Sequence, residues 1–195
     1  VFAEHEAAMR TVPDGMLAAE RLSVHERLQR YLAIECQDEA TWRPAQFEAV
    51  FGNQGAPYPP LAVPTDAGAI HMRGRIDRID CNVDDAVGAG LIDYKLQAVS
   101  TIRDRLPDDV QLPAYALMHG DAAQAAYLAL DDEKVTAVAS GTSEAELMAA
   151  AAAQGARLGQ TFAAMRDGAA LPAHGAESVC QWCEMAGLCR KEFFV

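Results

Sequence analysis

The chain has 195 residues, a length that fits one compact domain with a sizeable buried core. Hydrophobic residues make up 51% of it, which excludes a disordered chain, although 39 of them are alanine and contribute little core volume. The longest uninterrupted apolar run has seven residues. A helix that crosses a bilayer needs ~20. We therefore expect a soluble protein with no membrane partner. The cysteine pattern described below suits a reducing compartment, so we also expect a cytoplasmic location.

The charge is strongly acidic but unevenly distributed. The net charge of −12 by itself argues against a nucleic-acid partner, because cationic side chains drive phosphate binding. The window from Arg73 to Arg105, however, holds six basic and six acidic residues and is neutral. A metal ion bound by the acids of this window would make it positive.

The first segments are predicted to be helical. Residues 2–9 have the pattern of the middle of a helix, and since the chain starts at Val1 we expect it to be part of a longer polypeptide. From Asp14 to about Cys36, apolar residues recur at helical spacing, with Asp14 as the expected N-cap. We interpret this segment as a packing helix.

A different element is predicted from Trp42 to Phe51, and it contains Glu48 near its end. Proline-rich sequence follows and is expected to form a loop. The prolines of this loop are Pro57, Pro59, Pro60 and Pro64.

Residues 69–80 and 90–95 have a strand-like pattern with turn-forming residues between them, which predicts a hairpin. Asp77 lies near the end of the first predicted strand. Side chains alternate between the two faces of a strand, so Asp93 and Lys95 share a face of the second. The hairpin thus brings two carboxylates and one ammonium to adjacent strands.

After a polar loop, residues 110–119 predict a helix on which Gln111 and Tyr115, four residues apart, project together. Two strands are expected over residues 125–130 and 135–139. Ser143 and Glu146 then form a capping box for a long alanine-rich helix that reaches about residue 166. The order of helices and strands predicts a mixed α/β domain.

The acids of the hairpin indicate phosphodiester chemistry. Two carboxylates brought together favour protonation or a bound cation, and Mg²⁺ is held by one or two carboxylates while it accepts phosphate oxygens from a substrate. Such an ion polarises a phosphate and lowers the pKa of a bound water. A nearby lysine such as Lys95 orients the nucleophile or neutralises developing charge.

The spacing of these residues resembles a known family. Glu48, Gly74-x-x-Asp77, Asp93-x-Lys95 and Gln111-x-x-x-Tyr115 occur in the order typical of the PD-(D/E)XK nuclease superfamily, in its RecB-like exonuclease branch. The resemblance implies that Glu48, Asp77 and Asp93 bind Mg²⁺ or Mn²⁺ and that Lys95 assists the attacking water. It also implies that Gln111 and Tyr115 contact DNA. Asp77 fits the spacing after Gly74 better than Asp80 does.

The same resemblance implies a fold. We expect a restriction-endonuclease-like core, a central mixed sheet flanked by helices, within a single nuclease domain over residues 1–195. An N-terminal helical part is expected over residues 1–42, the core over 43–170 and a cysteine-rich end over 171–195.

Three of the five cysteines, Cys180, Cys183 and Cys189, crowd the C-terminal end, a pattern that suits metal or cluster ligands better than disulfides. The motif resembles the iron–sulfur staple of the same branch, in which a fourth, upstream cysteine completes a [4Fe–4S] cluster. Cys36 and Cys81 are the remaining cysteines, and His5 is a candidate for the histidine of that branch. Zinc in place of the cluster, or unligated thiols, are the alternatives.

These features lead to one functional expectation and two alternatives. We expect a metal-dependent DNA nuclease, an exonuclease of recombination or repair that works with a helicase subunit or domain. The first alternative is a catalytically idle nuclease-like module that binds DNA ends or a partner. The second is a zinc-dependent interaction module, for which Glu48, Gln111 and Tyr115 have no role.

Overall fold

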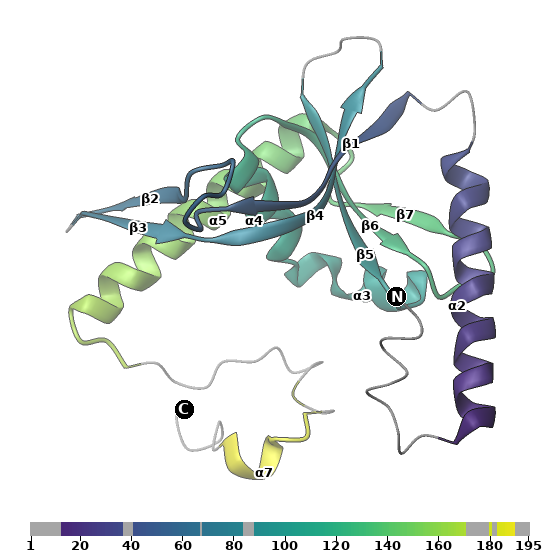
Figure 1. Cartoon of the computed structure of the whole chain (residues 1–195). Helices are drawn as coiled ribbons and strands as arrows, with labels where there is room; N and C mark the ends of the chain where they lie inside the picture. Colours follow the sequence, from purple (N-terminus) through teal and green to yellow (C-terminus); the bar gives the residue numbers. More distant parts are fainter. Residues whose placement is uncertain are drawn as a thin grey trace.

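A five-stranded mixed sheet forms the centre of the molecule (Figure 1). The computed structural model describes residues 13–36, 41–66, 68–83, 88–170, 180 and 183–189. The strand order is β1-β4-β5-β6-β7. These strands are β1 (Trp42–Phe51), β4 (Gly74–Asn82), β5 (Ala89–Lys95), β6 (Ala122–Ala129) and β7 (Thr136–Ala139). The expected central mixed sheet flanked by helices is confirmed.

The pairing of the strands includes one parallel ladder. Strand β4 pairs antiparallel with β1 and with β5, as the predicted hairpin requires, and β6 pairs antiparallel with β7. Strands β5 and β6 are parallel, with Asp93 opposite Tyr127. A parallel pair needs a crossover connection, and helices α3 (Val99–Arg105) and α4 (Gln111–His119) supply it. The crossover carries α4 back over the sheet, next to β5.

The predicted strand over residues 69–80 is in fact two strands. Strand β3 (Gly68–Met72) ends before Arg73, and β4 begins at Gly74, where a Cβ atom would lie 2.8 Å from the methyl carbon of Met118. Strand β3 pairs with β2 (Leu61–Thr65) in a separate hairpin beside helix α5 (Glu144–Arg166) (Figure 1). Pro64 therefore lies in a strand and not in the expected loop. Asp77 lies inside β4 and not near its end.

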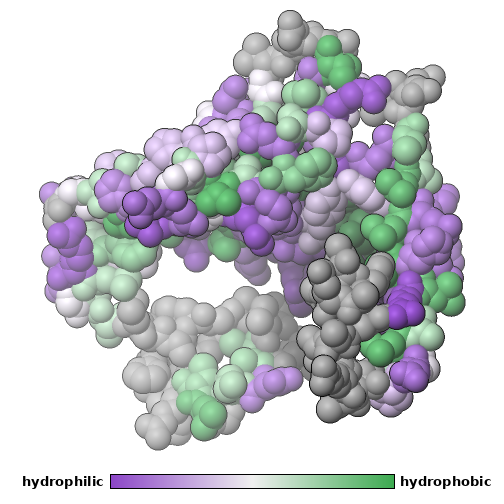
Figure 2. Space-filling view, in the orientation of Figure 1, coloured by the Kyte–Doolittle hydropathy of each residue, from purple (hydrophilic) through white to green (hydrophobic). Residues whose placement is uncertain are grey.

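Helix α2 (Asp14–Glu35) matches the predicted helix, but its N-cap is Pro13 and not Asp14. Pro13 has a φ of −58° but a ψ of 140°, so its backbone lies outside the helix and Asp14 is the first helical residue. Pro13 has no side-chain acceptor, and no side-chain hydrogen bond caps this end of α2. None of the described side chains of α2 is buried. Figure 2 shows apolar side chains exposed along this helix, at the right of the view. They include Met16, Leu22, Leu28 and Leu32.

Helices α3, α4 and α5 pack on one face of the sheet. Helix α3 and the short 3₁₀ turn Leu106–Asp108 occupy the segment that we expected to be a polar loop. Helix α5 (Glu144–Arg166) begins as predicted after Ser143, whose Oγ accepts a hydrogen bond from the amide of Glu146. The carboxylate of Glu146 bonds to Thr142 and not to the N-cap amide, so only half of the predicted capping box forms.

The sheet buries a different core on each face. Leu91 belongs to the larger core, which α4 and α5 cover with Leu112 and Leu147. Ile92 belongs to a smaller core on the opposite face, where Tyr31 of α2 packs at its edge. The alternation predicted along β5 is thus confirmed. None of the helices in the described ranges has the length and apolar character that a membrane span requires.

Candidate active site

The candidate site lies on the face of β5 that α4 covers. Asp93 and Lys95 project from this face, two residues apart, and the Lys95 ammonium lies 2.8 Å from Oδ2 of Asp93. Asp93 is only 3% exposed, whereas the Lys95 side chain is 29% exposed. The pair therefore has a buried carboxylate and an ammonium that solvent can reach.

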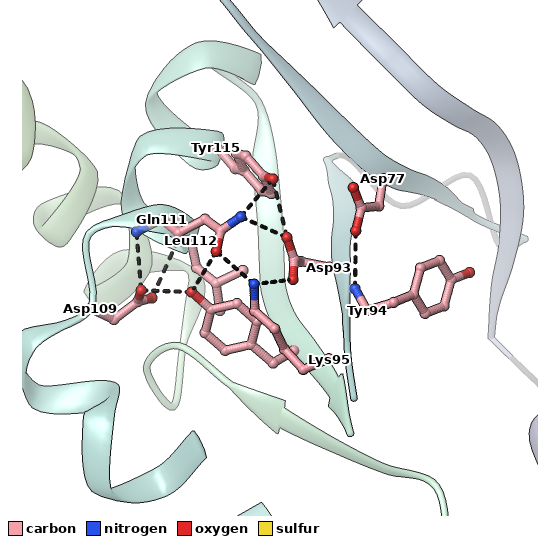
Figure 3. A network of polar contacts seen from close by, with 9 residues as sticks. Asp77, Asp93, Tyr94, Lys95, Asp109, Gln111, Leu112 and Tyr115 are labelled. Atoms are coloured by element: carbon pink, nitrogen blue, oxygen red, sulfur yellow. Dashed lines mark hydrogen bonds and ion pairs between the residues drawn. The ribbon is translucent and has the colours of Figure 1, made fainter. Parts of the chain in front are cut away.

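Gln111, the first residue of α4, connects the two members of this pair (Figure 3). Its Nε2 donates to Oδ1 of Asp93 at 2.7 Å, and its Oε1 accepts from Nζ of Lys95 at 2.9 Å. Tyr115 lies one turn further along the helix and donates its hydroxyl hydrogen to the same Oδ1 at 3.1 Å. Its hydroxyl oxygen also accepts from Nε2 of Gln111 at 2.8 Å. Gln111 and Tyr115 thus hold the Asp93–Lys95 pair in one geometry.

Two residues that the sequence analysis did not identify support this arrangement. The carboxylate of Asp109 accepts hydrogen bonds from the backbone amides of Gln111 and Leu112, and so caps α4. The Tyr127 hydroxyl donates to Asp109 at 2.6 Å, and the Tyr127 ring centroid lies 4.9 Å from the Lys95 ammonium. Asp109 directly precedes the helix that was predicted over residues 110–119, and aspartate is preferred at that N-cap position, so Asp109 was identifiable from sequence. Tyr127 was not, because its position depends on the parallel pairing of β5 with β6.

The environment changes the acidity of the buried groups. Burial raises the pKa of Asp93 above the ordinary range, and the charge of Asp77 adds to this, while Lys95 acts in the opposite direction. Burial also raises the pKa of Tyr115 and of Tyr127. Both phenols therefore stay protonated at neutral pH and remain hydrogen-bond donors.

Asp77 lies on the adjacent strand, beside Asp93 (Figure 3). Its Oδ2 accepts a hydrogen bond from the backbone amide of Tyr94 at 3.2 Å, which links β4 to β5 where the ladder ends. The negative charge of Asp77 adds to the rise in the pKa of the Asp93 carboxyl, as expected for two neighbouring carboxylates.

Glu48 lies across from Asp77 in the β1–β4 ladder, between the pairs Phe47–Arg78 and Ala49–Ile76. Its carboxylate, however, is 58% exposed and forms an ion pair with Arg75 at 2.7 Å. Glu48 also has a φ of +53°, which is uncommon for a residue with a side chain. In the described part of the chain, no three His, Cys, Asp or Glu residues are arranged to hold a metal ion. The structure brings Asp77, Asp93 and Lys95 together, with Gln111 and Tyr115, but not the carboxylate of Glu48.

The donors at this position nevertheless fit a hard divalent cation. Oδ2 of Asp93 is buried, and the partner that the described residues give it is the Lys95 ammonium at 2.8 Å. A carboxylate oxygen has two lone pairs, so one of them is left to accept a further contact. Such an oxygen, with the Asp77 carboxylate close to it, is the type of ligand that Mg²⁺ prefers. Asp77 and Asp93 are the residues that would hold the ion.

Asp80 belongs to a different network, on the opposite face of β4. It is buried and accepts two hydrogen bonds from the Arg78 guanidinium, which also donates to Glu35 at the end of α2. Burial raises the pKa of Asp80, and Arg78 opposes this shift. This cluster fastens α2 to the sheet and leaves Asp80 away from Asp93.

The cysteines are only partly described. Cys180 and Cys183 lie in one turn, in which the amide of Cys183 donates to the carbonyl oxygen of Cys180 at 3.2 Å. Cys36 and Cys81 are both exposed. His5 and most of the expected cysteine-rich end, residues 171–195, lie outside the described residues.

Comparisons with known proteins add independent evidence. The family model described as the PD-(D/E)XK nuclease superfamily matches residues 2–190. A curated protein of Acetivibrio thermocellus, named as one subunit of an ATP-dependent helicase/deoxyribonuclease, is 36% identical over 67 residues. That match covers 33% of this chain and 6% of the curated protein, so this chain corresponds to a small part of that relative.

A solved structure described as "Crystal structure of SSO0001" covers 97% of this chain and 80% of its own chain. Its sequence identity is 11% and its TM-score is 0.43. The family match, in contrast, includes every described residue and all of the candidate site. The five-stranded mixed sheet with helices on its faces is consistent with a restriction-endonuclease-like fold. The chain belongs to the PD-(D/E)XK nuclease superfamily.

Proposed function

We propose that this chain is a divalent-metal-dependent deoxyribonuclease domain that hydrolyses phosphodiester bonds as an exonuclease. The observation that carries the proposal is the cluster of Asp93, Lys95, Gln111 and Tyr115, with Asp77 beside it. A structural ion pair needs no second carboxylate nearby and no glutamine that bridges both of its charges. A phosphodiester hydrolase needs an anionic metal site next to a cation that is held in place.

Each side chain has a role in this proposal. Asp77 and Asp93 hold Mg²⁺ or Mn²⁺, which when bound polarises the scissile phosphate and lowers the pKa of a water molecule. Lys95 orients the attacking water or neutralises the charge that develops on the phosphate. Gln111 and Tyr115 hold the side chains of Asp93 and Lys95 in a fixed relative geometry. This positioning role is in addition to the DNA contact that the family resemblance implies for these two residues.

Glu48 is proposed as a third acidic ligand that joins when the site is loaded. Its ion pair with Arg75 is exposed, and such pairs contribute only about 0–1 kcal/mol. A bound cation therefore competes easily with Arg75 for this carboxylate. The positive φ of Glu48 is consistent with a backbone conformation kept for function.

The biological setting is also part of the proposal. The curated relative is named as part of a helicase/deoxyribonuclease, which supports a role in DNA recombination or repair beside a helicase subunit or domain. The net charge of −12 supports the same conclusion, because a chain this acidic needs other parts to guide DNA to it. We further propose that Cys180, Cys183 and Cys189 serve a [4Fe–4S] cluster in the full-length protein. Iron and sulfide analysis of that protein tests this.

Cleavage of end-labelled single-stranded, double-stranded and circular DNA tests the nuclease proposal. With Mg²⁺ or Mn²⁺ we expect linear DNA to be shortened from an end and circular DNA to be spared. Both EDTA and the substitution Asp93→Ala should abolish cleavage. The control variant is Asp66→Ala, which removes an exposed acid in the turn between β2 and β3.

The alternative, an idle nuclease-like module that binds DNA ends or a partner, predicts DNA or partner binding without cleavage. Activity that survives in EDTA, or that Asp93→Ala leaves intact, contradicts the proposed chemistry. Cleavage of circular DNA contradicts the exonuclease assignment alone.

A further inference from the structure

A cavity of about 400 Å³ opens beside the candidate site, between the end of β5 and the helices α3 and α4. Its volume lies within the range of small-molecule binding sites, ~300–1,000 Å³. Lys95, Gln111 and Tyr127 belong both to its wall and to the polar network described above. The cavity is therefore continuous with the proposed site of phosphate chemistry. Its other walls include Gln97, Ile102, Asp104, Arg105, Asp108 and Val110.

Several polar groups in this wall are unused. Within the described residues, the side chains of Gln97, Asp104, Arg105 and Asp108 make no hydrogen bond or ion pair. Asp109, in contrast, is fully engaged by two helix amides and Tyr127. The unused groups comprise an amide, which both donates and accepts, two carboxylates and one guanidinium. They are free to bond to a ligand.

The charge of the wall distinguishes between possible ligands. The wall of the cavity contains three carboxylates and two cations. The carboxylates are those of Asp104, Asp108 and Asp109, and the cations are Lys95 and Arg105. This excess of negative charge disfavours a phosphate group. The wall also has apolar parts, Ile102 and Val110. An uncharged, flat group with hydrogen-bond donors on its edge satisfies both the acids and the apolar surface.

We propose that this cavity binds the base of the nucleotide next to the scissile phosphate. The inference rests on the proposed function, which places that phosphate at Asp93 and Lys95. The exocyclic amino group of adenine, cytosine or guanine would donate to Asp104 or Asp108, and the Gln97 amide would bond to the ring edge. Thymine has no exocyclic amino group and is the poorest fit.

Binding of single-stranded oligonucleotides that carry one abasic nucleotide tests the proposal. The abasic residue is moved one position at a time from the end, and binding is measured by fluorescence anisotropy with Ca²⁺ in place of Mg²⁺. At one position we expect binding to weaken about 3- to 10-fold, the loss of one hydrogen-bonded contact. Thymine at that position should bind more weakly than cytosine.

A pair of matched variants identifies the cavity as the cause. Val110→Trp fills the cavity from an exposed position, and in this variant the abasic and intact oligonucleotides should bind equally. Leu96→Trp adds the same ring at an exposed position of a separate groove, which Tyr31 and Phe47 also line. This control should keep the position-dependent effect of the native chain.

The outcomes separate the two proposals. An abasic effect that is absent at every position, or that persists in Val110→Trp, overturns the base-binding inference. Cleavage in Mg²⁺ without such an effect therefore rejects the inference and leaves the nuclease proposal standing. A position-dependent effect without cleavage rejects the nuclease proposal and supports base binding by the idle nuclease-like module named above. A chain that binds no oligonucleotide overturns the inference.

Discussion

The substitution Gln111→Leu tests whether Gln111 acts by positioning Asp93 and Lys95. Leucine has a similar size but removes the amide group, and with it the 2.7 Å bond to Asp93 and the 2.9 Å bond from Lys95, which together bridge the ion pair. The 2.8 Å bond to the Tyr115 hydroxyl is lost as well. The ion pair between Asp93 and Lys95 remains. The variant therefore keeps the charges of the site but loses the group that fixes their geometry.

The expected loss follows from the two bonds that bridge the ion pair. Hydrogen bonds to charged groups contribute ~1.5–3 kcal/mol each, so the pair sets an upper limit of ~3–6 kcal/mol. Because Asp93 and Lys95 still attract each other, we expect about one bond's worth of transition-state stabilisation to be lost. A loss of ~1.5–3 kcal/mol lowers kcat roughly 10- to 150-fold.

Steady-state cleavage of labelled single-stranded DNA with Mg²⁺ measures this effect. If Gln111 positions the catalytic groups, kcat falls, whereas loss of its proposed DNA contact raises KM. The control Gln160→Leu makes the same change at an exposed position of α5 and should have native kinetics. Thermal melting of both variants confirms that they are folded. A rise in KM with an unchanged kcat refutes the positioning role and makes Gln111 a DNA contact.

Three further predictions address the rest of the network and the fold. Arg78→Met leaves the buried carboxylate of Asp80 without its cationic partner, so the free energy of unfolding in urea should fall by ~3–5 kcal/mol. A second change, Asp80→Leu, removes the unpaired charge and should restore most of this free energy. Equal losses in the single and double variants would contradict this. Tyr127→Phe keeps the ring beside Lys95 but removes the hydrogen bond to Asp109. The free energy of unfolding should therefore fall by ~1 kcal/mol, and kcat should fall several-fold. An unchanged kcat would argue against a supporting role of Tyr127. Hydrogen bonds from Thr142 lower the pKa of Glu146. The Glu146 charge therefore stabilises the fold at pH values above the unfolded-state pKa, and this stabilisation is lost as the pH falls through the folded-state pKa. Glu146→Gln should therefore lower the Tm at neutral pH, with the difference disappearing in acid, and a difference independent of pH would refute the assignment.

The elements of the hairpin and of the capped helices were predictable from local pattern. Alternation along β5 placed Asp93 and Lys95 on one face, and the spacing of Gln111 and Tyr115 placed both on one face of α4. These regularities have periods of two and 3.6 residues, so they are visible in a short window of sequence. The prediction of a polar loop before α4 was wrong, because helix α3 is short and begins without a side-chain cap, so its sequence carries little helical signal.

The assembly of the site depended on longer-range order. Tyr127 reaches the site only because β6 runs parallel to β5, and no local pattern specifies which strands become neighbours. In the tertiary structure, Asp80 pairs with Arg78 on the face of β4 opposite the candidate site. The Glu48 carboxylate pairs with Arg75. Glu48 could not be assigned a partner from spacing, since its side-chain direction depends on an unusual backbone conformation.

The sequence by itself determined the class of the fold and the candidate set of acids, and its motifs resemble the family whose model matches residues 2–190. It could do so because side-chain type and spacing along one strand or helix dictate which groups share a face. Only the tertiary structure decided which of these groups meet, which residues support them and where a cavity opens beside them. Contacts between strands and helices distant in sequence depend on strand order, crossover and packing, and these are properties of the whole chain.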